Sequence, residues 1–307
     1  MEIIYGLDKV QNSNDSVITL GTFDGLHLGH RKIIDKVLET SDELKLESVL
    51  LTFEPHPRVV LHKANQKQAQ LLSTIDEKLQ IVETAGIDKL VVIEFNQDFA
   101  ANSYVDFVEN YLIKKLKMKQ LIVGYDHAFG KDREGNFESL SLLAKRDGFG
   151  IYQVEPLLVG DQTVSSSLIR NLLFNGQVKD AAVFLGRHYQ ISGKVVPGDG
   201  RGKNLSFPTA NIEPDNPHKI VPKHGVYAVD VVVEGTRKKA MMNIGNRPTF
   251  ALSGYAMEVN IFDWDKDIYG KTITVFFKQR LRDEKKFSSV DELIEQLKSD
   301  KKLSLQI

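Results

Sequence analysis

Short apolar runs alternate with longer amphipathic segments in the first half of the chain, a pattern typical of strands followed by helices. Strands are expected at Val17–Leu20, Val49–Phe53, Leu90–Phe95 and Leu121–Val123. Within Leu28–Leu44, apolar residues at helical spacing, such as Ile34 and Val37, share one face and predict a helix. This βαβ rhythm predicts an α/β fold, a parallel, doubly wound sheet with helices on both faces.

Further helices are indicated by the residues at their ends. Thr74 and Glu77 have the spacing of a capping box, which predicts a helix that reaches Gly86. Another helix is expected from about residue 102 to about residue 117. Two short helices, Ser166–Phe174 and Gln177–Leu185, are expected to close this half of the chain.

The pattern changes near Gly186, where short strands separated by glycine and proline turns follow one another. These strands are expected at Tyr189–Val196, Val226–Val233, Lys239–Ile244, Met257–Phe262 and Lys271–Leu281. In the last of them, Ile273, Val275 and Phe277 recur at every second position, as in a strand with one buried face. Only Ser289–Leu297 is expected to be helical. This predicts a small closed β-barrel, and two domains at residues 1–185 and 186–307.

Composition narrows the class of protein. The chain has 307 residues, enough for two domains of ordinary size. Its net charge of −1 gives no sign of a nucleic-acid-binding surface. It has no cysteine, which excludes disulfides, thiolate zinc sites and cysteine nucleophiles. With no apolar leader and no long apolar run in the sequence, we expect a cytoplasmic protein without a membrane partner.

The segment Gly21–His30, GTFDGLHLGH, follows the first expected strand. Doubly wound sheets bind ligands at the carboxyl ends of their strands. Glycines there let the backbone approach a phosphate, and the next helix N-terminus offers N–H groups to an anion. His27 and His30 share a face if both lie in the first helical turn, where two imidazoles suit a polyphosphate. The alternative is a glycine-rich turn with two solvated histidines.

Two later segments suit the same edge of the sheet. Gly124–Gly130, GYDHAFG, follows the fourth expected strand, and Val164–Arg170, VSSSLIR, opens a helix with hydroxyl groups. Hydroxyls, backbone N–H groups and the guanidinium of Arg170 at a helix start can bind phosphate. Taken singly, the first segment could be a plain loop and the second a serine N-cap. Together with Gly21–His30 they indicate one nucleotide site.

These three segments, in this order, resemble the nucleotidylyltransferase module of bacterial bifunctional riboflavin kinase/FAD synthetases. The resemblance implies that the phosphate of FMN attacks the α-phosphorus of ATP and that pyrophosphate leaves. It implies that His27, His30 and Arg170 are catalytic, with Ser166 and Ser167 on the triphosphate. The remaining implied contacts are Gly21, Phe23, Asp24 and Gly29 with ATP, and Asp126 and Phe129 with the flavin.

The second half has its own glycine-rich segment, Gly198–Lys203, GDGRGK. It is not a P-loop, because Pro197 stands where that motif needs its first glycine and Asn204 follows the lysine. Three glycines with two basic side chains can still surround a phosphate with N–H groups. The alternative is a hairpin loop that binds nothing.

Three polar residues follow at informative positions. Thr209 and Asn211 point to one side if the chain there is extended, and their oxygens are hard ligands that suit Mg²⁺. Glu258 is a lone acid in an apolar strand. A carboxylate aimed into a barrel mouth could accept a proton from a hydroxyl, whereas a solvent-facing strand acid is the alternative.

The second half resembles the riboflavin kinase module of the same family. The matching runs are LGRHYQISGKVV, GDGRGKNLSFPTANI, HGVYAV, NIGNRPTF, DIYGKTITVFF and RLRDEKKF. The resemblance implies a Greek-key barrel and a terminal helix. The implied site is Thr209 and Asn211 at Mg²⁺ and ATP, Glu258 as base on the ribityl hydroxyl, Gly198, Gly200, Arg201, Gly202 and Lys203 on phosphate, and Arg280 and Arg282 beside the flavin.

Two residues depart from the family pattern, which has glycine where this chain has Ser206 and often histidine where it has Asn260. The expected function is phosphorylation of riboflavin to FMN and adenylylation of FMN to FAD, with Mg²⁺ as metal and ATP as co-substrate. We expect neither a nucleic acid nor an obligate protein partner. The alternatives are a chain with one active half, a flavin-binding regulator without turnover, and a nucleotidyltransferase for another substrate.

Overall fold

The computed structural model describes every residue of the chain except 12–13, 63–68, 199–206 and 247–254. The chain forms two compact units, Met1–Ser165 and Ser166–Ile307. The elements of the first unit are β1 (Glu2–Tyr5), η1 (Leu7–Lys9), β2 (Ser16–Leu20), α1 (Leu28–Leu44), β3 (Glu47–Glu54), α2 (Pro57–Val60), α3 (Ile75–Ala85), β4 (Lys89–Glu94), α4 (Gln97–Ala100), α5 (Tyr104–Phe107), η2 (Val108–Ile113), β5 (Met118–Gly124), η3 (Lys131–Arg133), α6 (Phe137–Asp147), β6 (Gly150–Val154), β7 (Leu158–Val159) and β8 (Gln162–Thr163).

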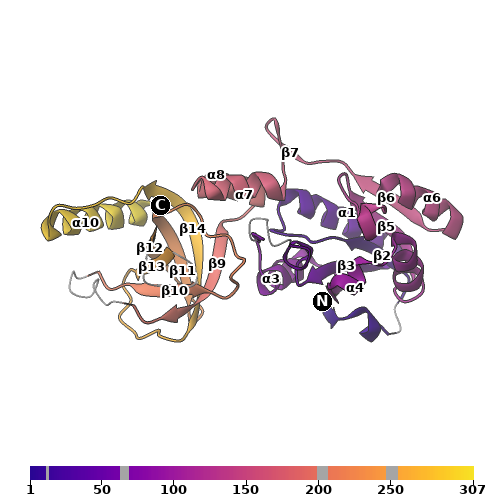
Figure 1. Cartoon of the computed structure of the whole chain (residues 1–307), viewed down its shortest axis with the longest axis horizontal. Coiled ribbons are helices and arrows are strands. Elements are labelled where there is room, and N and C mark those ends of the chain that lie inside the picture. Colours follow the sequence, from indigo (N-terminus) through magenta and orange to yellow (C-terminus); the bar gives the residue numbers. More distant parts are fainter. Residues whose placement is uncertain (12–13, 63–68, 199–206, 247–254) are drawn as a thin grey trace. The chain divides into compact units, whose positions relative to one another are not determined.

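The first unit is built on a parallel sheet with strand order β1-β4-β3-β2-β5-β6 (Figure 1). The four strands expected from the sequence form its centre, and β1 and β6 add an unpredicted strand at each edge. The chain runs from β2 through β3 to β4 in one direction and then returns to β5 on the other side of β2. The predicted doubly wound α/β fold is therefore confirmed, with its switch point between β2 and β5.

Helices cover both faces of this sheet. Neighbouring residues on β2 point to opposite faces: Val17 packs in one hydrophobic cluster with Ile34 of α1 and Val82 of α3. Ile18 packs in the other cluster, with Leu112 and with residues of α6. Alternate residues of the strand thus pack into two separate hydrophobic cores, as expected for a strand covered on both sides.

The helix expected over residues 102–117 is wound differently from the prediction. Ser103 caps the short α5, and η2 continues it as a π-helix in which the N–H of Lys114 bonds to the carbonyl of Glu109. Buried residues recur every four positions at Val108, Leu112 and Leu116. A spacing of four residues is longer than the 3.6 residues of an α-helical turn. The wider π-helical turn therefore brings these side chains to the same face, toward the core.

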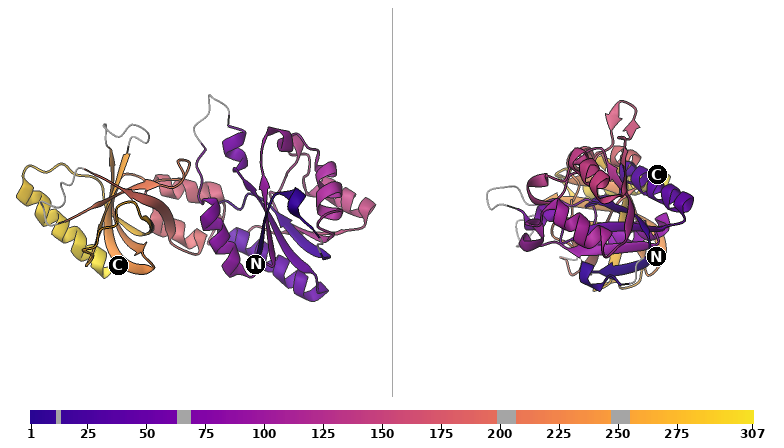
Figure 2. Two further views of the ribbon diagram at one scale, coloured as in Figure 1. Left: turned by 90° about the horizontal axis from the view of Figure 1, so that it is seen from below. Right: turned by 90° about the vertical axis from the view of Figure 1, so that its right-hand side faces the viewer.

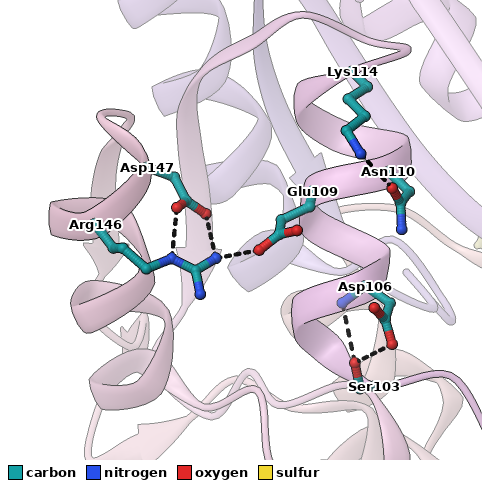
Figure 3. A network of polar contacts seen from close by, with 7 residues as sticks. All are labelled: Ser103, Asp106, Glu109, Asn110, Lys114, Arg146 and Asp147. Carbon is teal, nitrogen blue, oxygen red and sulfur yellow. Dashed lines mark hydrogen bonds and ion pairs between the residues drawn. The ribbon is translucent and has the colours of Figure 1, made fainter.

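Exposed polar contacts connect η2 with α6 (Figure 3). The Nε atom of Arg146 donates to Asp147 across 2.6 Å, and the same guanidinium contacts Glu109 on η2. The hydrogen bond with Asp147 is the main reason that the pKa of Arg146 is raised. Because these side chains are solvent-exposed, the network contributes little to stability compared with the buried core beneath it.

The second unit holds two short helices, a barrel and a terminal helix. Its elements are α7 (Ser166–Phe174), α8 (Val178–Leu185), β9 (Tyr189–Val196), β10 (Ala210–Pro214), β11 (Gly225–Val233), β12 (Thr236–Asn246), β13 (Tyr255–Ile261), β14 (Thr272–Arg282) and α10 (Val290–Gln306). The barrel is closed in the order β10-β13-β12-β11-β14-β9, with all pairs antiparallel. Figure 2 shows its strands, coloured orange to yellow, in a second view. Strand β10 lies beside β13 at the end of the meander β11-β12-β13, which confirms the predicted Greek key.

The barrel interior is filled by alternate side chains. Ile273, Val275 and Phe277 on β14 are buried, as their spacing predicts, and the ring of Phe277 meets that of Tyr227 at 5.3 Å, edge to face. The terminal helix α10 is longer than predicted and packs against β11 and β12. The structure counts α7 and α8 with the second unit. The functional boundary after residue 185 remains a prediction.

Candidate active sites

The loop Gly21–His30 leaves the sheet at its switch point. It connects β2 to α1, and the neighbouring strand β5 ends at Gly124, where the second predicted segment begins. A Cβ atom on Gly124 would lie 3.1 Å from Cδ1 of Ile33 on α1. The two segments therefore leave adjacent strands next to the same helix, in the position where doubly wound sheets bind nucleotides.

His27 and His30 lie together at the start of α1. Nδ1 of His27, the N-cap residue, accepts a hydrogen bond from the backbone N–H of His30 at 3.2 Å. The two rings stack with their centroids 3.7 Å apart and an angle of 14° between them. Because Nδ1 of His27 is the acceptor, the neutral ring carries its proton on Nε2. The first turn of α1 contains no acidic residue that would offset the positive end of the helix dipole.

The backbone of the Gly21–His30 loop is strained. Phe23 and Leu26 have φ angles of 46° and 39°, a region that side chains other than glycine rarely adopt. Gly25 has a φ of 86°, and a Cβ atom there would lie 2.8 Å from Leu72. Such conformations persist only where the surroundings enforce them, and they concentrate at functional sites.

Asp24 is one of the residues that enforce this backbone. Its side chain is 2% exposed, and Oδ1 accepts hydrogen bonds from the N–H groups of Leu72 (2.9 Å) and Ser73 (3.0 Å). The Ser73 hydroxyl in turn accepts from the N–H of Gly25 at 2.9 Å. The contact of Asp24 with ATP stays a prediction. In the structure, the Asp24 carboxylate stabilises the loop through its hydrogen bonds to Leu72 and Ser73. This role of Ser73 was not predicted, although Ser73 directly precedes the predicted capping box of Thr74 and Glu77.

A chain of aromatic rings lies beyond the carboxyl ends of β3, β4 and β5. Successive centroids, each 5.4–5.8 Å from the next, connect Phe53, Phe95, Phe99, Phe107, Phe129 and His127. Burial lowers the pKa of His127 to about 4, with Arg133 adding to the shift, so its ring is neutral at pH 7. Its Nε2 is shielded from water and has no hydrogen-bond partner among the described residues. The exposed Asp126 adjoins this end of the chain of rings.

The barrel brings together the three polar residues predicted for it. Asn211 on β10 is directly paired in register with Glu258 on β13, and Thr209 immediately precedes β10. A Cβ atom on Gly198 would lie 1.9 Å from Nδ2 of Asn211, so a side chain at position 198 would displace that amide from its observed place. Glu258 is half-buried. A carboxylate thus stands across from an amide and a hydroxyl whose oxygens are ligands that Mg²⁺ prefers.

Asn260, one of the two departures from the family pattern, holds the same region. It is buried, and its Nδ2 donates to the carbonyl of Pro208 at 2.6 Å, next to Thr209. A cavity of about 390 Å³ opens beside this contact, and its lining includes Phe207, Phe262 and Trp264. Ser206, the other departure, lies outside the described residues.

The two predicted flavin-site arginines have protein partners. Three hydrogen bonds of 2.8–3.1 Å join the guanidinium of Arg282 to the carboxylate of Asp300 on α10, which is 1% exposed. Nη2 of Arg280 contacts the carbonyl of His224 and the carboxylate of Asp283. Both side chains therefore take part in packing the barrel, and their contact with flavin stays a prediction.

The other predicted residues fall in two groups. Gly200, Arg201, Gly202 and Lys203 lie outside the described residues. Ser166, Ser167 and Arg170 lie on α7, which the structure counts with the second unit, and Arg170 is buried. A joint phosphate site of Arg170 with His27 and His30 therefore stays a prediction.

The fold and these residues define a class of protein, an ATP-using transferase with one α/β unit and one barrel unit. A family model described as FAD synthetase matches residues 9–168, and one described as riboflavin kinase matches residues 185–307. The chain belongs to the family of bifunctional riboflavin kinase/FMN adenylyltransferases.

Relatives support this membership over nearly the full chain. The bifunctional riboflavin kinase/FMN adenylyltransferase of Bacillus subtilis is 38% identical, over 95% of this chain and 92% of that protein. The protein of the same description from Escherichia coli K12 is 34% identical, over 98% and 96%. A crystal structure described as a macrolide-efflux protein from Streptococcus pneumoniae has a TM-score of 0.90 at 30% identity, and the match covers 100% of both chains. Among the described helices of this chain, none has the length and apolarity to cross a membrane.

Proposed function

We propose that this chain makes FAD from riboflavin in two ATP-dependent steps, one in each half. The observation that carries the proposal is the coincidence of two family matches with two sets of polar residues. The FAD synthetase match contains the Gly21–His30 loop, and the riboflavin kinase match contains Asn211 and Glu258. Riboflavin, FMN and ATP are the proposed substrates, and the cytoplasm, which supplies ATP, is the proposed location.

Adenylyl transfer is proposed for the N-terminal half of the chain, residues 1–185. A phosphate oxygen of FMN attacks the α-phosphorus of ATP, the bond to the β-phosphate breaks, and pyrophosphate leaves. His27 and His30 donate to the phosphate oxygens on which charge develops, and the N-terminus of α1 adds its backbone N–H groups. Ser166, Ser167 and Arg170 hold the triphosphate in this proposal. Such catalysis is positioning and electrostatic stabilisation without a covalent enzyme intermediate.

The part of the aromatic chain at Phe129 and His127 is the proposed flavin subsite of the first unit. An isoalloxazine ring is flat and apolar over most of its surface, and it packs well against ring edges and faces. Asp126 is exposed and lies two residues after the end of β5, next to His127, where it can contact a polar part of FMN.

The barrel phosphorylates riboflavin. Glu258 accepts the proton of the ribityl hydroxyl, whose oxygen attacks the γ-phosphorus of ATP, and ADP leaves. Thr209 and Asn211 supply hard oxygen ligands for Mg²⁺, and the room that Gly198 leaves for the Asn211 amide fits this role. Mg²⁺, when bound, offsets the charge of the phosphates. The glycine-rich segment with Gly200, Arg201, Gly202 and Lys203 is proposed to surround the phosphates.

The remaining proposed contacts of the barrel are with the adenine base of ATP and with the flavin ring. The cavity beside Pro208 and Asn260 adjoins the Thr209–Asn211 segment, and its aromatic lining suits the base of ATP. Arg280 and Arg282 are proposed to border the flavin. A regulator without turnover would need neither a base nor a pair of metal ligands, so the observed set favours the enzyme.

A flavin time course tests this function. Purified protein is incubated with riboflavin and MgATP, or with FMN and MgATP, and the flavins are separated chromatographically. We expect FMN first and FAD after it in one sample, FAD directly in the other, and neither reaction with excess EDTA. FAD only from supplied FMN, or FMN without FAD, would show that one half is inactive.

A further inference from the structure

A buried lysine reaches the Gly21–His30 loop from α3. Lys78 is 3% exposed, and its Nζ donates to the carbonyl of Thr22 and to the hydroxyl of Thr52, each at 2.8 Å. Thr22 belongs to the loop, and Thr52 is a fully buried residue of β3. Nothing in the local sequence pattern distinguishes Lys78 from an exposed lysine of an amphipathic helix, so its burial was not predicted.

Within the described part of the chain, this ammonium group has no close ionic partner. No carboxylate oxygen among the described residues lies within 4 Å of Nζ, and both acceptors are neutral. Burial lowers the pKa of Lys78 to about 8, and the charges of Asp24 on the loop and Glu54 at the end of β3 only partly oppose this. Buried charges without a paired ion are costly and uncommon.

The contacts of Lys78 do not by themselves explain why a cation is placed there. The hydroxyl of Thr52 lies 3.3 Å from the carbonyl of Thr22 and can donate to it directly. An apolar side chain of the same length at position 78 would therefore leave no buried carbonyl without a donor. Strained or costly groups retained at a ligand-binding edge point to a functional task.

We infer that Lys78 is a positioning residue for adenylyl transfer, which holds the Thr22 carbonyl and places a fixed positive charge beneath the phosphate-binding loop. This inference rests on the function proposed for the first unit. The loop has Phe23 and Leu26 in strained conformations. Two of its other residues, Asp24 and Thr22, accept hydrogen bonds from the segment Leu72–Lys78. That segment thus fixes the backbone from which His27 and His30 project.

A second buried lysine in the same unit provides a matched control. Lys89 begins β4 at the opposite, amino edge of the sheet, and its Nζ lies 2.9 Å from Glu47 and 3.5 Å from Glu2. Its charge is thus paired, and it lies far along the strand from the carboxyl edge. Loss of Lys89 removes ion pairs without touching the loop.

The test compares Lys78→Met with Lys89→Met in the full-length protein. For adenylyl transfer from FMN and MgATP, we expect kcat to fall by roughly ten-fold or more in Lys78→Met, with KM for ATP changed less than about three-fold. Riboflavin phosphorylation and the melting temperature should not fall. Lys89→Met should lower the melting temperature and leave kcat for adenylyl transfer at the wild-type value.

Thr52→Val keeps the test decisive if Lys78→Met does not fold. This variant removes one acceptor of Lys78, and we expect a smaller loss of kcat that is not additive with Lys78→Met. Wild-type kcat in both variants, or an equal loss in Lys89→Met, overturns the inference. A wild-type protein that makes no FAD, or a His30→Ala variant that makes it at the normal rate, would instead overturn the proposed function of the unit.

Discussion

Asn211 and Glu258 lie directly opposite each other on the neighbouring strands β10 and β13. Side chains of such a pair are on the same side of the sheet and a few ångströms apart. A proposed metal and phosphate ligand therefore stands beside the proposed base. A hydroxyl that loses its proton to Glu258 would do so next to the phosphate that it attacks, as phosphoryl transfer requires.

Glu258→Gln removes the proposed base and changes little else, because glutamine has nearly the same shape. We expect FMN formation from riboflavin to fall by roughly 10²-fold or more, since general-base catalysis contributes about that much. FAD formation from supplied FMN should continue at the wild-type rate. Loss of both activities would argue against two separate sites.

His30→Ala is the corresponding change in the first unit. Removal of one well-placed donor to a developing charge costs on the order of 10²–10³ in rate, and we expect that loss in FAD synthesis from FMN. Phosphorylation of riboflavin serves as the internal control and should be unchanged. If the variant makes FAD at full rate, the histidine pair has no role in phosphate stabilisation.

Lys78 predicts a particular pH dependence of stability. Its pKa is about 8 in the folded protein and 10.5 ordinarily, so the unfolded chain binds more protons between these values. The free energy of unfolding should therefore rise with pH from about 8 to 10.5, by about 3 kcal/mol from this residue. The nearby charges of Asp24 and Glu54 favour the charged ammonium and oppose part of this shift.

The comparison that isolates this effect is denaturant unfolding of wild type and Lys78→Met at pH 7 and pH 10. We expect the variant to be the more stable protein at pH 7, with the difference shrinking at pH 10. A variant less stable than wild type at pH 7 would mean that the charge stabilises the fold, contrary to our account.

Arg282→Ala leaves the buried carboxylate of Asp300 with Gln296, at 3.0 Å, as its one remaining side-chain donor in the described part of the chain. Removal of one partner of a buried pair is strongly destabilising, and we expect a loss of about 3 kcal/mol in the free energy of unfolding. The double change Arg282→Ala with Asp300→Ala should recover part of it. The KM for riboflavin in the same single variant measures separately whether Arg282 also touches the flavin.

Local patterns were sufficient to predict most of the framework. The helix Leu28–Leu44 and the strand Tyr189–Val196 have the predicted bounds, and the capping box of Thr74 and Glu77 forms with both hydrogen bonds. Helix α6 was missed, although Asn136 caps its start and Gly148 ends it in a left-handed conformation. Those end signals are in the sequence and could have found it.

The supports of the first site could not be read from local patterns. Asp24 bonds to residues almost fifty positions later, and Lys78 bonds to a residue of the Gly21–His30 loop and to a residue of β3. Only the fold makes them neighbours. The pairing of Asn211 with Glu258 likewise depends on the register of the closed barrel, which the alternation of apolar residues does not specify.

The central claim is that two independent sites on one chain act in sequence. The most direct test mixes equal amounts of His30→Ala and Glu258→Gln with riboflavin and MgATP and follows the flavins over time. Alone, the first variant should stop at FMN and the second should leave riboflavin unchanged. The mixture should form FAD, because FMN released by one variant is adenylylated by the other. Absence of FAD from the mixture, with each variant active in its intact half, would contradict the account.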